Sequence, residues 1–110
     1  MTIRNLTSLK CKPCEGNVDK LSKKDINENL KDIKGWRIIK KNHLIKLFSF
    51  PDFNSALEFV NEIGELAENE GHHPDIALSW GKVEICLYTH AIKGLSMNDF
   101  ILAAKIDLAL

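Results

Sequence analysis

The sequence lacks the features that mark membrane, secreted and nucleic-acid-binding proteins. No apolar run approaches the roughly 20 residues that cross a bilayer, and residues 1–10 lack the apolar core of a signal peptide. Neither sign of charge predominates, since Lys+Arg and Asp+Glu both number 15. Nucleic acid or an anionic membrane as main partner would favour a basic protein. We therefore expect neither partner.

Cysteine is scarce, and its odd number argues against a disulfide framework. Three cysteines suit a reduced, cytoplasmic protein. Cys11 and Cys14 form a Cys-x-x-Cys, but a structural zinc site needs four ligands, and the remaining cysteine, Cys86, lies alone in a predicted strand. A redox motif should follow a strand and open a helix, whereas Glu-Gly-Asn follows here. We predict that residues 1–20 form an irregular leader with a reduced loop packed on the surface.

The remaining chain alternates between helical and strand-like patterns. Helix starts are predicted at Ser22, Asp52 and Ser96. The predicted order is helix, hairpin, helix, hairpin, helix, over residues 22–35, 36–50, 51–71, 73–90 and 95–108. This order predicts an α+β two-layer sandwich, with an antiparallel four-stranded sheet and three helices packed on one face. With 110 residues and 45% hydrophobic content, the chain is expected to form a single domain, 1–110.

Periodicity also predicts which side chains are buried. The predicted apolar stripe of the second helix comprises Phe53, Ala56, Leu57, Val60, Ile63, Gly64 and Ala67. The predicted stripe of the third helix comprises Phe100, Ala103, Ala104 and Leu108. The uncovered sheet face is expected to carry Arg37, Lys46, Ser49, Glu84 and Tyr88.

The second hairpin is the most informative stretch of the sequence. Two runs of alternating apolar residues flank Gly81 and Lys82. If these two residues form the turn, Trp80 faces Val83 and Ile76 faces Leu87. A slip of one residue would send every side chain to the opposite face, so any inference about neighbouring side chains depends on this turn.

Three of the four histidines gather at the open end of that hairpin. The same register, extended outward, places His73 opposite His90, with His72 beside His73. His43 lies beside the turn of the first hairpin, and we interpret it as a solvated residue at a strand end.

Three clustered imidazoles could bind a metal, perform acid–base chemistry or serve the structure. Zinc can bind three imidazoles with one open position, but His72 and His73 are adjacent and point to opposite faces of an extended segment. Imidazole exchanges protons near neutral pH without a metal. Glu68 and Glu70 end the preceding helix, where carboxylates oppose the macrodipole, a violation more often found near functional sites. We favour acid–base chemistry.

One series of residues has a specific spacing: Glu68, His72-His73-Pro74, Trp80, Thr89-His90 and Asp99. Together with the Cys-x-Pro-Cys-x-Gly leader and a Gly-Trp pair at 35–36, this series resembles the signature of the pterin-4a-carbinolamine dehydratases. The resemblance implies the α+β fold and dehydration of 4a-hydroxytetrahydropterins to quinonoid dihydropterins. It also implies a homodimer or homotetramer, a functional link to an aromatic amino acid hydroxylase, and catalysis without metal or organic cofactor.

The resemblance implies roles for the individual residues. The implied catalytic residues are His72, His73 and His90. The implied substrate-binding or orienting residues are Glu68, Pro74, Trp80 and Asp99. His72 and His90 would form the acid–base pair, in an order that stays open, while His73 would bind and orient the pterin. One departure is Ile76, where many members carry an aromatic residue beside the pterin pocket.

Two alternatives stay open on the sequence. Some animal members of this family serve as dimerisation partners of a transcription factor, so the alternative function is a dimerising interaction module without essential catalysis. Asp99 also fits a helix cap, because it stands third after Ser96 as Asp25 does after Ser22. On the sequence alone, we expect losing either carboxylate to have a similar small effect on stability.

Overall fold

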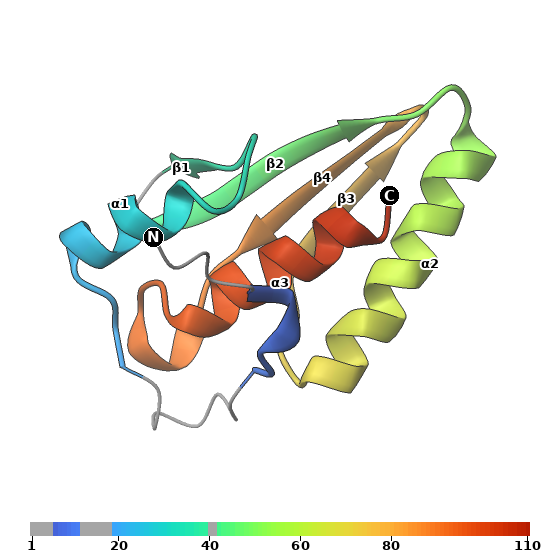
Figure 1. The fold of residues 1–110 in the computed structure, drawn as a ribbon. Helices are drawn as coiled ribbons and strands as arrows, with labels where there is room; N and C mark the ends of the chain where they lie inside the picture. Colours follow the sequence, from blue (N-terminus) through green and yellow to red (C-terminus); the bar gives the residue numbers. More distant parts are fainter. Residues whose placement is uncertain (1–5, 12–18, 40–41) are drawn as a thin grey trace.

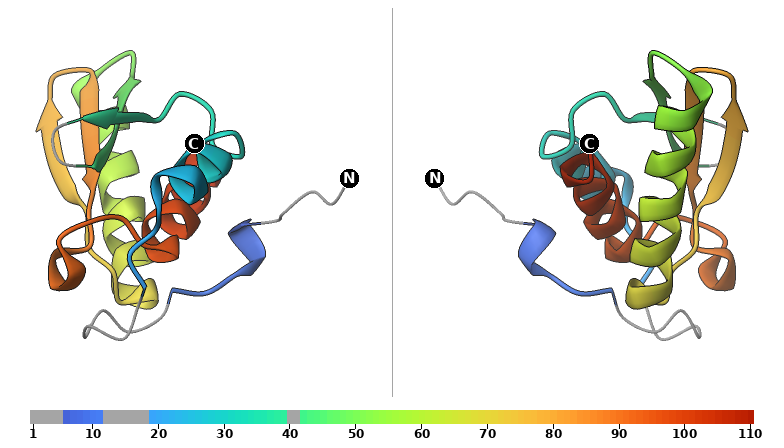
Figure 2. Two further views of the ribbon diagram at one scale, coloured as in Figure 1. Left: turned by 90° about the vertical axis from the view of Figure 1, so that its left-hand side faces the viewer. Right: turned by 90° about the vertical axis from the view of Figure 1, so that its right-hand side faces the viewer.

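The structure, a computed structural model, describes residues 6–11, 19–39 and 42–110. Its strands are β1 (Arg37–Ile39), β2 (His43–Ser49), β3 (Asp75–Ser79) and β4 (Lys82–Leu87). Its helices are α1 (Lys23–Leu30), α2 (Phe53–Glu70) and α3 (Met97–Leu108), with 3₁₀ turns η1 (Leu6–Ser8) and η2 (His90–Ile92). The antiparallel sheet has the order β1-β2-β4-β3, and the three α-helices cover one face (Figures 1 and 2). The predicted α+β sandwich is confirmed.

The helix ends follow from local capping chemistry. The Ser22 hydroxyl accepts a hydrogen bond from the backbone N–H of Asp25 at 3.2 Å, and the Asp52 carboxylate accepts one from Ser55 at 2.7 Å. Each contact satisfies a helix N–H that has no partner within the helix. Helix α2 ends at Gly71, whose φ of 67° is left-handed and suits glycine. These boundaries agree with the sequence prediction.

Two predicted apolar stripes were partly wrong. Phe53 and Leu57 of α2 are 43% and 37% exposed, and Leu108 of α3 is 71% exposed. The buried line of α2 consists of Ala56, Phe59, Ile63 and Ala67. The seven predicted residues cover a wider arc of the helix than can face one sheet, so those at the edge of the arc, Phe53 and Leu57, stay exposed to solvent. Helix α3 is buried on more than one side because it lies between α1 and α2 (Figure 1).

Lys46 lies on the helix-covered face of the sheet, so its predicted position on the uncovered face was wrong. It is opposite the buried Ile85 in the β2–β4 ladder. Its ammonium contacts Asp107 at 2.8 Å and the carbonyl oxygen of Lys34 at 2.9 Å, while the Trp36 indole N–H donates to the other Asp107 oxygen at 3.0 Å. A buried charge is tolerated where it is paired in this way, and the pair joins β2 to the end of α3.

The β3–β4 turn begins one residue earlier than predicted. Ser79 lies opposite Lys82, so Trp80 and Gly81 form the turn. Gly81 has a φ of 69°, and a Cβ there would lie 3.0 Å from the carbonyl oxygen of Phe50, so the second turn position needs glycine. Every opposite partner therefore moves by two positions, which leaves each side chain on its predicted face.

The described part of the leader packs where α2 ends. The Cys11 backbone N–H donates to the Glu70 carboxylate at 2.9 Å, and the Cys11 thiol contacts the carbonyl oxygen of Asn98 at 3.5 Å. The second Glu70 oxygen pairs with the Lys105 ammonium at 2.7 Å. These two contacts offset the unfavourable interaction between the Glu70 carboxylate and the macrodipole at the end of α2. Cys14 lies outside the described residues, so the interpretation of the Cys-x-x-Cys stays a prediction.

Glu70→Gln should destabilise the protein in a pH-dependent way. Burial alone would raise the pKa of Glu70, but the Cys11 N–H and the Lys105 ammonium together lower it below the ordinary value of 4.5. The ionised carboxylate therefore stabilises the fold above that pH, and the contribution is lost as the pH falls through the folded-state pKa. We expect a loss of about 1–3 kcal/mol at pH 7 by urea unfolding.

The control for this prediction is Glu62→Gln, which changes an exposed carboxylate on the same helix. It should leave the free energy of unfolding nearly unchanged at pH 7 and at pH 3. The difference between wild type and Glu70→Gln should shrink from pH 7 to pH 3. A difference that stays constant over this range would contradict the prediction.

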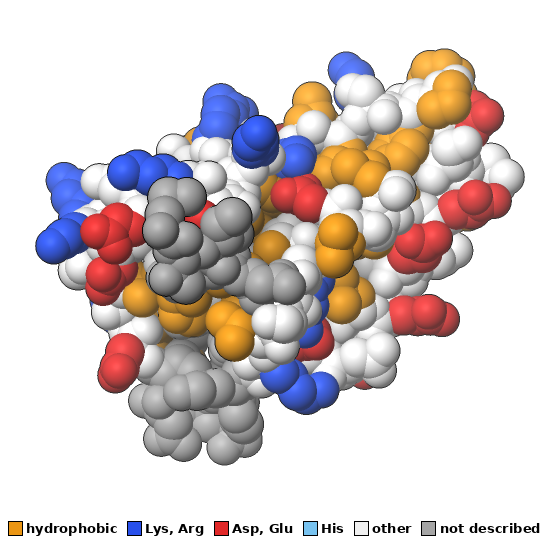
Figure 3. All heavy atoms as spheres, viewed as in Figure 1, with side chains coloured by type: hydrophobic (Ala, Val, Ile, Leu, Met, Phe, Trp, Pro, Cys, Tyr) orange, Lys and Arg blue, Asp and Glu red, His pale blue; other side chains and the backbone are white. Residues whose placement is uncertain are grey.

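No described helix is both long and apolar enough to span a lipid bilayer. The face in Figure 3 carries both Lys/Arg and Asp/Glu side chains, and acidic groups line the side formed by α2. This distribution shows no continuous basic surface on that face.

Candidate active site

A buried hydrogen-bond network surrounds Asp99, which has no exposed surface. One of its carboxylate oxygens contacts His72 Nε2 at 2.6 Å. The other accepts from the Thr89 hydroxyl at 2.7 Å and from the Ser96 backbone N–H at 2.9 Å. Since an ionised carboxylate only accepts, His72 donates from Nε2. Because Thr89 gives its single proton to Asp99, the Ser96 hydroxyl must donate to Thr89 across their 2.9 Å contact.

This network joins two segments that are distant in sequence. His72 immediately precedes His73, and Thr89 immediately precedes His90. Both contact the same carboxylate from the first turn of α3. Asp99 is therefore a helix cap and also the point that holds the two histidine-bearing segments together.

The three histidines have different environments. His72 is only 4% exposed, whereas the His73 side chain is 60% exposed and His90 is exposed. The predicted pairing of His73 with His90 across a ladder was wrong, because β3 begins at Asp75 and His90 belongs to the 3₁₀ turn η2. The convergence comes from the Asp99 network rather than from strand pairing.

His73 forms an exposed pair with the last turns of α2. Its Nε2 lies 2.7 Å from the Glu68 carboxylate, whose side chain is 78% exposed. Gly71 ends the helix in a left-handed conformation and turns the chain, so that position 73 comes back beside position 68. Pro74 follows and is half-buried. A charge pair this exposed adds little stability, but it orients the imidazole.

A shallow hollow of about 420 Å³ lies on α2 next to this pair. It is lined by Gly64, Glu65, Glu68 and Asn69. Gly64 contributes to it by its missing side chain, because a Cβ there would meet no atom within 4 Å. The hollow gives the His73–Glu68 pair an open approach from solvent.

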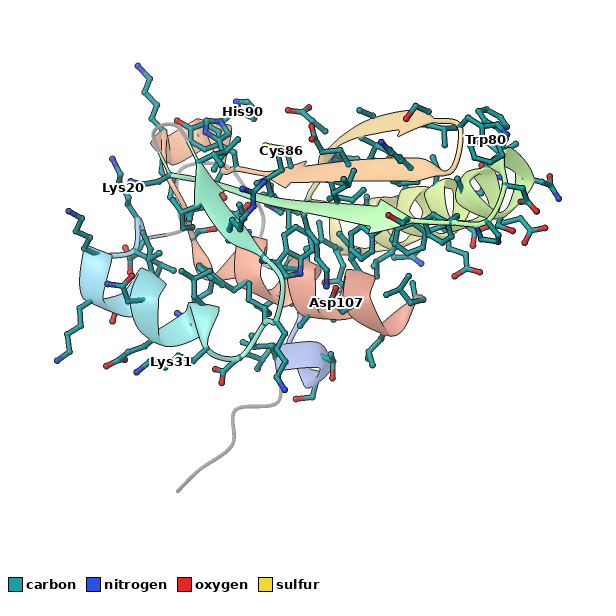
Figure 4. The ribbon with its side chains drawn as sticks, turned by 90° about the horizontal axis from the view of Figure 1, so that it is seen from above. Lys20, Lys31, Trp80, Cys86, His90 and Asp107 are labelled. Carbon is teal, nitrogen blue, oxygen red and sulfur yellow. The ribbon has the colours of Figure 1, made fainter. Side chains whose placement is uncertain are left out.

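Trp80 and Ile76 lie apart from the histidines. Trp80 is 69% exposed in the β3–β4 turn, at the opposite end of the sheet from His90 (Figure 4). The five residues of β3 lie between it and Pro74, so the two are about 20 Å apart along the strand. Ile76 is opposite Ile85 and packs partly against the core, on the helix-covered face.

His43 lies at a strand end, as predicted, but it is half-buried rather than fully solvated. Its ring stacks on the Tyr88 ring with centroids 3.9 Å apart and an interplanar angle of 13°. Tyr88 in turn meets His90 edge to face, at 5.0 Å and 81°. This contact follows from the β2–β4 register, which continues from Leu44 opposite Leu87 to position 43 opposite position 88, and no local sequence pattern indicates it.

Cys86 is a poor candidate nucleophile. Burial raises the pKa of its thiol, and the negative charges of Asp75, Glu84 and Asp99 raise it further. The thiol therefore stays protonated at neutral pH, whereas the thiolate is the reactive form.

Within the ranges that the structure describes, no three His, Cys, Asp or Glu side chains are grouped so that they could hold a metal ion. The His72 Nε2 is engaged by Asp99 and the His73 Nε2 by Glu68. These contacts direct two of the imidazoles toward carboxylates instead of toward a shared point. The expectation of a metal-free site stays a prediction.

Exhaustive chelation should leave any acid–base activity of this site within about twofold of the untreated protein, because proton transfer by imidazole groups needs no metal. The measurement compares turnover before and after dialysis against a strong chelator, with added zinc as a second arm. Activity that disappears on chelation and returns with zinc would overturn the acid–base interpretation.

Comparison with known proteins gives a consistent picture. The family model of the pterin 4 alpha carbinolamine dehydratases matches residues 19–109. A Rickettsia bellii protein is 49% identical over 110 residues, covering 98% of this chain and 97% of the relative. A Rubrobacter xylanophilus protein is 43% identical over 102 residues, covering 93% and 95%. Both are named pterin-4-alpha-carbinolamine dehydratase, with the activity marked as inferred.

Two solved structures share the fold. A Brucella melitensis protein named transcriptional coactivator/pterin dehydratase has a TM-score of 0.79 at 27% identity, over 83% of this chain and 98% of that one. A pterin dehydratase-like protein identified as a RuBisCO assembly factor in the alpha-carboxysome has a TM-score of 0.58 at 28% identity, over 68% and 88%. By its sequence and by its fold, the chain belongs to the pterin-4-alpha-carbinolamine dehydratase family.

Proposed function

We propose that the protein is a hydro-lyase that converts 4a-hydroxytetrahydropterins to quinonoid dihydropterins and water by histidine acid–base catalysis. The supporting observation is the fully buried Asp99 carboxylate, which binds His72 and the residue before His90. A buried carboxylate that orients an imidazole is a recurring arrangement for proton transfer. Family membership supports the same reaction class.

The reaction needs two proton transfers and no change of oxidation state by an external reagent. The C4a–O bond breaks as a proton reaches the leaving hydroxyl, and a proton leaves the neighbouring ring nitrogen as the C=N bond forms. We assign these transfers to His72 and His90. The Asp99 carboxylate accepts a hydrogen bond from His72 Nε2 and so holds this imidazole in one orientation.

Binding of the pterin is assigned to the exposed residues beside this pair. His73, oriented by Glu68, and the half-buried Pro74 lie next to His72 in sequence and face the open side of α2. Trp80 is left out of this assignment, because it lies at the far end of the sheet. The biological setting stays a prediction: cytoplasmic recycling of the tetrahydropterin cofactor of an aromatic amino acid hydroxylase.

The test is a dehydratase assay on freshly generated 4a-hydroxytetrahydropterin. The wild type should accelerate dehydration well above the spontaneous rate, and the double variant His73→Ala/His90→Ala should lose most of this acceleration. Both exposed side chains can change without disturbing the core, so circular dichroism should show a folded variant. A wild type no faster than buffer would refute the proposed activity.

A second candidate function is a dimerising interaction module. The Brucella neighbour carries a coactivator name, and the described chain exposes several large apolar side chains. These are Leu9, Leu47, Phe53, Leu57, Trp80, Leu108 and Leu110. Interaction sites are marked by such side chains where they form one contiguous apolar surface. Partner association that survives loss of the histidines, in a protein without turnover, would favour this function over the enzyme.

The protein is expected to form a homodimer or homotetramer. Strands β1 and β3 are the two edges of the sheet, and each has one side without a strand partner within the described residues. Such edges favour pairing with a second copy. Light scattering at micromolar concentration should give a mass two or four times the 12.5 kDa of the chain. A monomer mass would contradict this prediction.

A further inference from the structure

Three aromatic rings from three segments contact one another at the end of the sheet where His90 lies. His43 comes from the start of β2, Tyr88 follows the end of β4, and His90 opens η2. Tyr88 lies between the two imidazoles: it is parallel to His43, at 3.9 Å, and nearly perpendicular to His90, at 5.0 Å. Both geometries are favourable for aromatic rings. Figure 4 shows His90 at this end of the sheet, beyond Cys86 on β4.

The position of the Tyr88 ring is determined by the backbone on both sides. Leu44 is opposite Leu87, so the next outward cross-strand pair is His43 and Tyr88. Directly opposite residues of an antiparallel pair have adjacent side chains on the same face of the sheet. On the other side, Thr89 is buried and hydrogen-bonded to Asp99. The residues before and after Tyr88 are therefore held, and His43 covers one face of its ring.

His90, in contrast, depends on Tyr88 for its orientation. Its side chain is exposed, and within the described part of the chain it makes no hydrogen bond or ion pair that would orient the imidazole. An imidazole that transfers protons must be held within about 0.5 Å of the productive geometry. The edge-to-face contact with Tyr88 is the interaction that can do this.

We propose that Tyr88, supported by His43, is a positioning residue that orients the His90 imidazole for proton transfer. The proposal rests on the proposed dehydratase function. Tyr88 acts here through its ring rather than its hydroxyl, because the contacts with both imidazoles are ring contacts. The role is distinct from that of Asp99, which holds the backbone segment but does not touch the His90 side chain.

The kinetic test compares variants that keep or remove the ring. Tyr88→Leu should lower kcat about tenfold with KM within about twofold, because an interaction felt only at the reacting geometry affects kcat. Tyr88→Phe should keep near-wild-type kcat. His43→Leu should lower kcat by about threefold, and His43→Phe should restore it. The control is Leu47→Ala, an exposed change farther along β2, which should leave both constants unchanged.

A double-mutant cycle tests whether Tyr88 acts through His90. In a His90→Gln background, Tyr88→Leu should cause no further loss of kcat, since the group that it positions is gone. An equal loss in both backgrounds would overturn the proposal. A rise in KM at unchanged kcat would also overturn it, because Tyr88 would then contact the substrate instead.

Proton NMR of the histidine rings tests the ring contact without any turnover. The His90 Cε1–H resonance should shift in Tyr88→Leu, because the ring current of the tyrosine is lost, and should stay in place in Leu47→Ala. An unshifted resonance in Tyr88→Leu would overturn the proposal. A wild type that shows this shift pattern but no dehydratase activity would refute the proposed function and the catalytic part of this inference together, while the ring contact itself would stand.

Discussion

Asp99→Asn is expected to lower kcat about 100-fold or more in a folded protein. The carboxylate accepts three donors: His72 Nε2–H, the Thr89 hydroxyl and the Ser96 backbone N–H. An amide has only one oxygen, and the Ser96 N–H cannot become an acceptor. The amide oxygen must therefore face Ser96, and the amide NH₂ faces His72. His72 can then no longer donate from Nε2 to this side chain, so its imidazole loses the tautomer and the orientation that the carboxylate imposes.

The matched control is Asp25→Asn in the other Ser-x-x-Asp sequence. Asp25 is exposed and follows the cap Ser22, whereas Asp99 is fully buried among its donors. The sequence alone suggested similar stability losses for the two variants. With this difference in burial, we expect about 1–3 kcal/mol for Asp99→Asn and less than about 0.5 kcal/mol for Asp25→Asn.

Turnover and urea unfolding of both variants decide the question. Asp25→Asn should retain wild-type turnover, and Asp99→Asn should lose far more activity than its stability loss explains. If both folded variants turned over substrate at near-wild-type rates, Asp99 would be a helix cap and nothing more.

His72→Gln should lower kcat by about 10²–10³-fold while the protein stays nearly as stable as the wild type. The glutamine amide can donate to Asp99 in place of Nε2, so the buried carboxylate keeps its donor. The amide cannot exchange protons near neutral pH, so acid–base chemistry is lost. This variant separates the chemical role of His72 from its role as an anchor.

His72→Ala is the companion variant, and it should lose both properties. Its turnover should fall as in His72→Gln, and its free energy of unfolding should fall by about 2–4 kcal/mol, because the change leaves a cavity and an unpaired acceptor oxygen on a buried carboxylate. Dehydratase kinetics and urea unfolding of the two variants side by side provide the measurement. If His72→Gln kept wild-type turnover, His72 would only hold Asp99 in place, and the acid–base pair would need another member.

Local sequence patterns were sufficient for the helices and for the fold class. Ser22, Asp52 and Gly71 act on the backbone within a few residues of themselves, so their effect is visible in a short window of sequence. Alternation of apolar residues placed the strands for the same reason, and the face of each residue in the second hairpin survived a two-residue error in register. The spacing from Glu68 to Asp99 was enough to indicate the family.

Strand register and burial needed the tertiary structure. Gly81 is compatible with either position of the turn in sequence, and the strand pairing of Ser79 with Lys82 shows which one the chain uses. Lys46 follows the strand alternation to the helix-covered face, where its partly buried ammonium needs a paired acceptor. That acceptor, Asp107, is contributed by α3 from the far end of the chain.

The sequence by itself determined which residue types meet at the candidate site, but only the tertiary structure decided what each can do. His72 and His73 are adjacent and chemically identical, yet one is buried against Asp99 and the other is exposed beside Glu68. Their difference arises from a carboxylate 27 positions away, and no local pattern contains it. Likewise, His43 and Tyr88 meet because β2 and β4 are neighbours in the sheet. Long-range pairing of this kind sets the burial and orientation of the imidazoles, on which the proposed chemistry depends.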